Sequence, residues 1–132
     1  MNKFQLLLLP LCLINACTVP VTPEEAKSAV FATEPSFDEA IARITDHIKE
    51  IAVDPESVLV ECNPALKGWA RRDTTGRPQF GWLYLCDINA RNRFGGYTGD
   101  KRYIFIINGN SFYVVSPEFL RYGFKGKAGV VD

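Results

Sequence analysis

The clearest pattern in the chain is a helical repeat of apolar residues that begins after Ser36. Ser36 and Glu39 have the spacing of a capping box, in which a hydroxyl and a carboxylate satisfy free amides at the start of a helix. Apolar residues then recur every three or four positions, at Phe37, Ala40, Ile41, Ile44, Ile48 and Ile51. Asp54-Pro55 ends the repeat, because the residue before a proline is disfavoured in a helix. The pattern predicts one main helix that buries a single face.

From Glu56 onward, apolar and polar residues alternate, which is typical of strands. The stretch at 80–88 is apolar on both faces, so we expect this strand to lie inside the sheet. Gly109-Asn110 has the composition of a hairpin turn. Strands are expected at 57–63, 67–72, 80–88, 102–108 and 111–115, and a short helical turn at 116–122 before a glycine-rich tail. The patterns predict an α+β fold with one main N-terminal helix packed on a four- to five-stranded antiparallel sheet.

The first sixteen residues have the layout of an export signal. Lys3 gives the start a positive charge, and an apolar run follows from Phe4 to Ile14. About eleven residues are too few for a membrane-spanning helix, which needs about 20. A basic start before a short apolar run is typical of a secretory signal peptide.

The segment Ile14-Asn15-Ala16-Cys17 resembles the bacterial lipobox, in which an aliphatic and a small residue precede a cysteine. The resemblance implies cleavage before Cys17, a diacylglycerol on its sulfur and an acyl group such as palmitate on the new amino terminus. Thr18, rather than aspartate, implies export to the outer membrane. Several acyl chains, at roughly 0.8 kcal/mol per buried methylene, would hold the protein firmly on that membrane. The alternative is an ordinary cleaved signal, whose small-residue rule Ile14 fits poorly.

The expected domain organisation follows from these segments. Residues 1–16 form the signal peptide, 17–35 the lipidated amino terminus and a tether, and 36–132 a single α+β domain. The tether is expected because Pro20, Pro23 and Pro35 oppose a long helix, although a short one could begin at Pro23.

Two cysteines remain if Cys12 leaves with the signal and Cys17 is lipidated. Cys62 and Cys86 both fall on expected strands, with side chains on faces predicted to point inward. Secreted proteins fold in an oxidising compartment, so we expect a Cys62–Cys86 disulfide. The alternative is a pair of buried free thiols.

A longer motif surrounds the end of the central strand. It comprises Gly81-Trp82, Cys86, Asn89-Ala90-Arg91-Asn92 and Phe94-Gly95-Gly96-Tyr97-Thr98-Gly99, preceded by Asp54-Pro55-x-Ser57. This pattern resembles that of small, mostly uncharacterised bacterial exported proteins and lipoproteins. The resemblance supports the fold and the location and implies no particular activity.

Arg91, Arg93 and Tyr97 are candidate ligand-binding residues in this motif. Two arginines near aromatic rings could bind a carboxylate or phosphate of lipid or peptidoglycan. The alternative is a structural corner, in which asparagines and glycines satisfy a tight turn and the arginines are solvated.

The sequence favours no enzyme class. Residues 95–101 have the wrong spacing for a phosphate loop, and no G-x-S-x-G motif occurs. The chain has one histidine and its remaining cysteines lack zinc-ligand spacing, so no metal, cofactor or catalytic site is expected.

Charge is balanced overall but divided between the two halves. Residues 17–61 hold ten acidic and three basic side chains, and residues 62–132 hold five acidic and eleven basic ones. The halves could compensate each other within the fold, or the basic half could face an anionic partner.

These observations favour a non-enzymatic, lipid-anchored accessory or interaction subunit of the bacterial cell envelope. Its expected partners are the outer membrane, through the lipid on Cys17, and another envelope protein; no nucleic-acid partner is expected. The domain would face the periplasm. The alternatives are a binding module for an anionic ligand at Arg91, Arg93 and Tyr97, and an inhibitor of an envelope hydrolase with residues 73–79 as a projecting loop.

Overall fold

The computed structural model describes residues 21–72, 76–121, 123–124 and 126–132. Its helices are α1 (Pro23–Ser28), α2 (Phe37–Ile51) and α3 (Pro117–Leu120), with a 3-10 turn at Pro55–Ser57. Its strands are β1 (Leu59–Cys62), β2 (Leu66–Ala70), β3 (Gln79–Asn89), β4 (Lys101–Asn108), β5 (Ser111–Val115) and β6 (Ala128–Val130). None of the helices in these residues is long and apolar enough to cross a membrane. The signal peptide and Cys17 lie outside the described residues.

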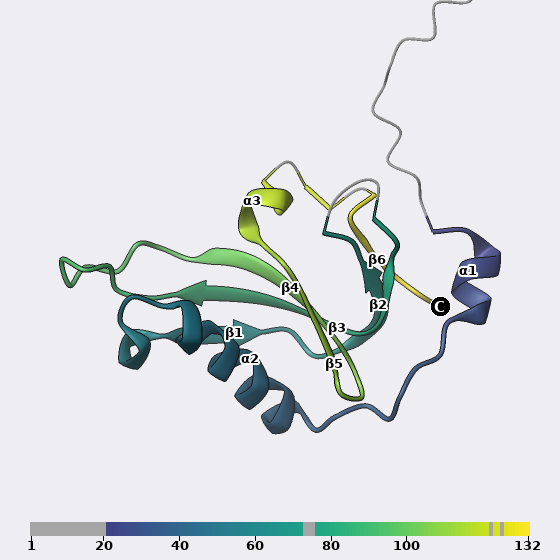
Figure 1. Ribbon diagram of the computed structural model, residues 1–132, viewed down its shortest axis with the longest axis horizontal. Coiled ribbons are helices and arrows are strands. Elements are labelled where there is room, and N and C mark those ends of the chain that lie inside the picture. Colours follow the sequence, from purple (N-terminus) through teal and green to yellow (C-terminus); the bar gives the residue numbers. More distant parts are fainter. Residues whose placement is uncertain (1–20, 73–75, 122, 125) are drawn as a thin grey trace, which may run out of the picture.

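The strands form one antiparallel sheet around the long strand β3 (Figure 1). Its order is β5-β4-β3-β2-β6, and β1 also pairs with β3. Both β1 and β2 lie on the same edge of β3: β1 pairs with its C-terminal half and β2 with its N-terminal half. Pro64 lies in the break between them, where proline cannot donate to the ladder.

Helix α2 covers one face of the sheet (Figure 1). The Ser36 hydroxyl caps its first turn by accepting a hydrogen bond from the Glu39 amide, which is the hydroxyl half of the predicted capping box. The helix buries Ala40, Ile44 and Ile48. On the sheet these side chains join Tyr84, Cys86, Ile88, Phe105 and Ile107 in one buried cluster.

The opposite face has a second, smaller cover made by the C-terminal part of the chain. Leu83, Ile104, Ile106 and Val115 point to this side, and Leu120 of α3 packs on them. Strands β3 and β4 carry apolar side chains on both faces, and successive side chains point to opposite faces. The sheet therefore lies between two cores.

The predicted α+β class and the antiparallel sheet are confirmed, and two details are wrong. The sheet has six strands, not four to five, because the glycine-rich tail contributes β6. A Cβ atom at Gly129 would lie 2.6 Å from the Trp69 Nε1 atom, so this position needs a glycine. With glycine there, the segment lacks the alternation of apolar and polar residues by which a strand is predicted. The main helix is also not clearly N-terminal, since α1 precedes it.

The segment between α1 and α2 is attached to the sheet. Asn108 Oδ1 accepts a hydrogen bond from the Ala32 amide at 2.7 Å, and Asn108 Nδ2 donates one to the Val30 carbonyl at 2.8 Å. Trp82 Nε1 donates a third, to the Ala32 carbonyl, at 2.8 Å. These contacts fix the position of the described part of the predicted tether around residues 30–32.

Candidate functional site

The candidate site is the loop at residues 90–100, which connects β3 to β4. The two strands and this loop extend past the rest of the sheet, at the end of the molecule opposite α1 (Figure 1). Every residue from Arg91 to Asp100 is exposed. The last part of the sequence motif therefore projects from one end of the sheet (Figure 1).

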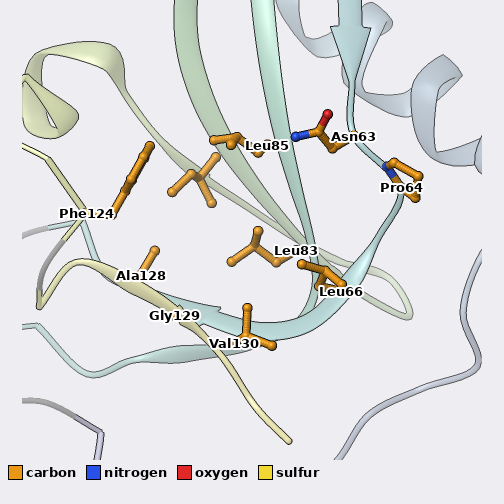
Figure 2. A pocket seen from close by; sticks show the side chains of 10 residues that line it. Asn63, Pro64, Leu66, Leu83, Leu85, Phe124, Ala128, Gly129 and Val130 are labelled. Carbon is orange, nitrogen blue, oxygen red and sulfur yellow. The ribbon is translucent and has the colours of Figure 1, made fainter.

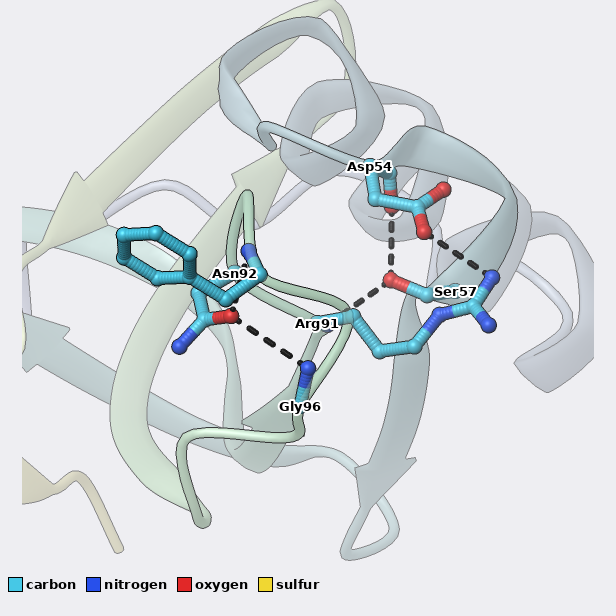
Figure 3. Close-up of polar contacts among 6 residues, drawn as sticks. Asp54, Ser57, Arg91, Asn92 and Gly96 are labelled. Carbon is cyan, nitrogen blue, oxygen red and sulfur yellow. Dashed lines mark hydrogen bonds and ion pairs between the residues drawn. The ribbon is translucent and has the colours of Figure 1, made fainter.

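Asn92 organises the turn at the tip of this loop. Its backbone N–H donates to the Gly96 carbonyl at 2.9 Å, and its carbonyl accepts from the Gly95 N–H at 3.0 Å. Its side-chain oxygen accepts from the Phe94 and Gly96 amides at 2.9 and 3.3 Å (Figure 3). Gly95 has a φ of 81°, which favours glycine at this position. One asparagine thus satisfies several backbone groups of the turn.

A second set of contacts holds the base of the loop to the segment after α2 (Figure 3). The Ser57 hydroxyl accepts a hydrogen bond from the Arg91 amide at 2.8 Å and donates one to the Asp54 carbonyl at 2.7 Å. The Arg91 guanidinium pairs with the Asp54 carboxylate at 2.9 Å. The two halves of the sequence motif, Asp54-Pro55-x-Ser57 and the segment from Asn89 to Gly99, therefore meet in one contact. We call this contact, made by Asp54, Ser57 and Arg91, the clasp.

The three predicted ligand-binding residues lie in this one loop but do not form one cluster of free groups. Arg91 and Tyr97 are opposite each other in an isolated antiparallel bridge. Arg91 is already paired with Asp54, and this ion pair joins the acidic half of the sequence to the basic half. Arg93 lies farther out, with its guanidinium carbon 5.3 Å from the centre of the Phe94 ring.

Phe94 belongs to the sequence motif but is not counted among the candidate ligand-binding residues predicted from it. Its side chain is 84% exposed, more than any other large apolar side chain in the described residues. The sequence offers only a weak signal for it, namely a phenylalanine between an arginine and two glycines, outside any apolar period. The candidate site is thus a turn that is held by hydrogen bonds to Asn92 and that exposes Phe94 and Arg93 to solvent.

The predicted disulfide is confirmed: Cys62 and Cys86 are bonded. They lie directly opposite each other on β1 and β3, with Cα atoms 4.1 Å apart, and they are separated by 24 positions in the sequence. Cys86 is fully buried beneath α2. The bond joins the two strands whose ends carry the clasp.

Several ionisable groups of the sheet have shifted pKa values, and the pKa of Glu118 in α3 is lowered by hydrogen bonding. Two hydrogen bonds from the Arg102 guanidinium, each 2.8 Å, hold the pKa of Asp87 below its ordinary value. Burial raises the pKa of Tyr84 and Tyr103, so both phenols remain protonated at neutral pH. The described residues contain no group of three or more histidine, cysteine, aspartate or glutamate side chains that could hold a metal ion.

A separate apolar hollow of about 210 Å³ lies on the second face of the sheet, between the sheet and the C-terminal segment (Figure 2). Leu83 and Leu85 form its floor, and Leu66, Phe124 and Val130 form part of its walls. These last three side chains are exposed. Asn63 is the polar side chain among the residues that line it, so the hollow offers a ligand very little to orient it.

Comparison of the chain with protein-family models, with curated proteins and with solved structures gave no match. The functional conclusion is therefore built on the chain's own residues and their geometry.

Proposed function

We propose that this chain is a lipid-anchored protein of the bacterial cell envelope that acts by contact, as a non-enzymatic accessory subunit of another envelope protein. Its anchor is the acylated Cys17, inserted in the outer membrane, and its domain faces the periplasm. The contact is made by the loop at 90–100.

The observation that carries this proposal is the combination of exposure and order in one loop. Phe94 is 84% exposed, while the amides of Phe94 and Gly96 are bonded to Asn92. Exposed aromatic and arginine side chains are enriched in protein interfaces. A loop that is already ordered loses little conformational entropy on binding, which favours a role in recognition.

A scan of photo-crosslinking positions in the cell tests this proposal. The photo-reactive residue p-benzoylphenylalanine is placed singly at exposed positions around the domain: Val30, Glu50, Gly96, Asn110 and Arg121. We expect a discrete protein adduct from at least one of these positions. If no position gives a protein adduct above the level of the unirradiated sample, the chain does not act by contact.

The alternative function is a binding module for an anionic lipid headgroup or for peptidoglycan. The exposed Arg93 and Tyr97 favour it, whereas the pairing of Arg91 with Asp54 leaves that charge partly compensated. Arg91→Ala with Arg93→Ala should sharply reduce retention on anionic vesicles or on peptidoglycan if the alternative holds. Unchanged retention removes it.

Inhibition of a hydrolase remains the third proposal, since an inhibitor also needs a projecting segment. The loop expected to project for this role is 73–79, and its residues 73–75 lie outside the described residues.

A further inference from the structure

The Phe94 ring is exposed to water at the tip of an ordered turn. Burying a phenylalanine side chain stabilises a protein, and here that stabilisation is not gained within the fold. The backbone on both sides is fixed by Asn92, so the ring projects from a defined point. This arrangement is typical of an anchor residue that fills a pocket on a partner.

The charges near Phe94 indicate the chemistry of that pocket. Residues 91–99 carry two arginines and no acidic side chain. The clasp turns the Arg91 guanidinium toward Asp54, whereas Arg93 stays at the tip, beside the Phe94 ring. The tip therefore offers one apolar ring with one cation next to it. The complementary surface has an apolar floor and a carboxylate at its rim.

The position of the tip favours a protein over a membrane as the partner. Figure 1 shows α1 and the tip at opposite ends of the long axis of the molecule. In the sequence, Cys17 precedes Val21, the first described residue before α1, by four positions. An anchor at Cys17 would thus join the described fold at the end that lies farther from the tip.

We propose that Phe94 and Arg93 form a plug that inserts into an apolar pocket with an acidic rim on a partner protein. The inference rests on the proposed contact function, and it names the residues and the partner's chemistry. The plug differs from an anionic-ligand site because its affinity comes mainly from the ring and Arg91 is not needed as a free charge.

Crosslinking through Gly96 tests the plug directly. A Cβ atom at Gly96 meets no atom within 4 Å, so p-benzoylphenylalanine fits there without displacing the loop. In cells that produce the full chain, we expect a discrete protein adduct from position 96. Phe94→Ala in that background should lower the adduct about tenfold, the effect of losing about 1.4 kcal/mol of binding free energy.

Matched variants separate the ring, the charge and the fold. Arg93→Lys keeps a cation and should retain most of the adduct, whereas Arg93→Glu should abolish it. Phe94→Leu keeps apolar bulk and should lie between the wild type and Phe94→Ala. Because Phe94 is exposed, its variants should unfold at the same temperature as the wild type.

The outcomes distinguish the plug from the contact function. Protein adducts from other positions but not from 96 overturn the plug and the assignment of the contact to the loop at 90–100, but leave a contact function elsewhere on the domain standing. An adduct from 96 that Phe94→Ala leaves unchanged overturns the plug alone. An adduct from 96 to lipid alone also overturns it. Absence of protein adducts at every position overturns both.

Discussion

At the residue scale, Ser57 is the side chain that joins the most distant parts of the candidate site. It is buried, and its hydroxyl accepts from Arg91, 34 positions later, while it donates to the Asp54 carbonyl. A small hydroxyl can make both bonds at once, whereas a methyl group can make neither. Hydrogen bonding within the fold therefore explains Ser57, Arg91 and Asn92 of the sequence motif.

Ser57→Ala should destabilise the protein by about 1–3 kcal/mol, because it leaves the Arg91 amide without its partner in a partly buried position. Denaturant unfolding of the purified protein measures this loss. Ser28→Ala removes an exposed hydroxyl in α1 and is the matched control, with an expected change within about 0.5 kcal/mol. Equal effects of the two substitutions would contradict the role of Ser57 in the clasp.

A pH effect follows from the pair formed by Asp87 and Arg102. The pKa of Asp87 is lowered in the folded protein, so the pair stabilises the fold above the ordinary aspartate value of 3.8. This contribution is lost as the pH falls below that value and through the folded pKa. Asp87→Asn should therefore flatten the acid limb of the plot of unfolding free energy against pH.

Arg102→Gln, alone and combined with Asp87→Asn, provides the control for this prediction. Arg102→Gln should flatten the acid limb in the same way, and combining it with Asp87→Asn should add nothing further. Both side chains are partly exposed, so water screens the pair and the effect is small. An acid limb that keeps its slope in Asp87→Asn would contradict the assignment.

At the element scale, β3 organises the molecule because it pairs with three other strands and carries residues of both cores. The disulfide ties β1 to its C-terminal half, and Asn108 at the end of β4 ties the segment around residue 31 to its N-terminal half. Each tie joins elements far apart in the sequence. Each should therefore contribute to stability mainly by restricting the unfolded or undocked chain.

Removing the disulfide should lower the free energy of unfolding by about 3 kcal/mol, on the chain-entropy estimate for a loop of this length. Cys62→Ala combined with Cys86→Ala makes the change, and denaturant unfolding measures it. Treating the wild type with reductant under unfolding conditions should give a similar loss. Equal stability of oxidised and reduced protein would contradict the estimate.

Asn108→Ala should release the segment that precedes α2. It removes the bonds to Ala32, Val30 and the Phe80 carbonyl, so the Ala32 amide should exchange its hydrogen faster and stability should fall by about 1–2 kcal/mol. Hydrogen exchange detected by mass spectrometry measures the release. Asn110→Ala, in the exposed turn, is the control and should leave exchange at Ala32 unchanged.

At the scale of the whole molecule, the sequence predicts the elements better than their arrangement. Local periodicity locates α2 and five strands, since a buried face imposes its own repeat on the residues. It misses β6, where packing against Trp69 requires glycine, and the docking of Ala32, where the partner is 76 positions away. The position of Phe94 is missed for a related reason, because exposure at a loop tip leaves no periodic pattern.

The acidic and basic halves of the sequence are joined at one point of the structure. The Arg91–Asp54 pair joins the basic and acidic halves at the clasp. The expected membrane anchor precedes α1 in the sequence. The ordered tip with Arg93 and Phe94 lies at the end of the molecule opposite α1 (Figure 1).

We propose above all that the mature chain is held on a membrane through Cys17. Intact-mass measurement of the protein isolated from the membrane fraction tests it most directly. The account predicts a chain of residues 17–132 that carries the added mass of a diacylglyceryl group and an amino-terminal acyl group, and that becomes 2 Da heavier on reduction of the Cys62–Cys86 bond. A soluble product that begins at Met1 and carries no lipid would contradict it.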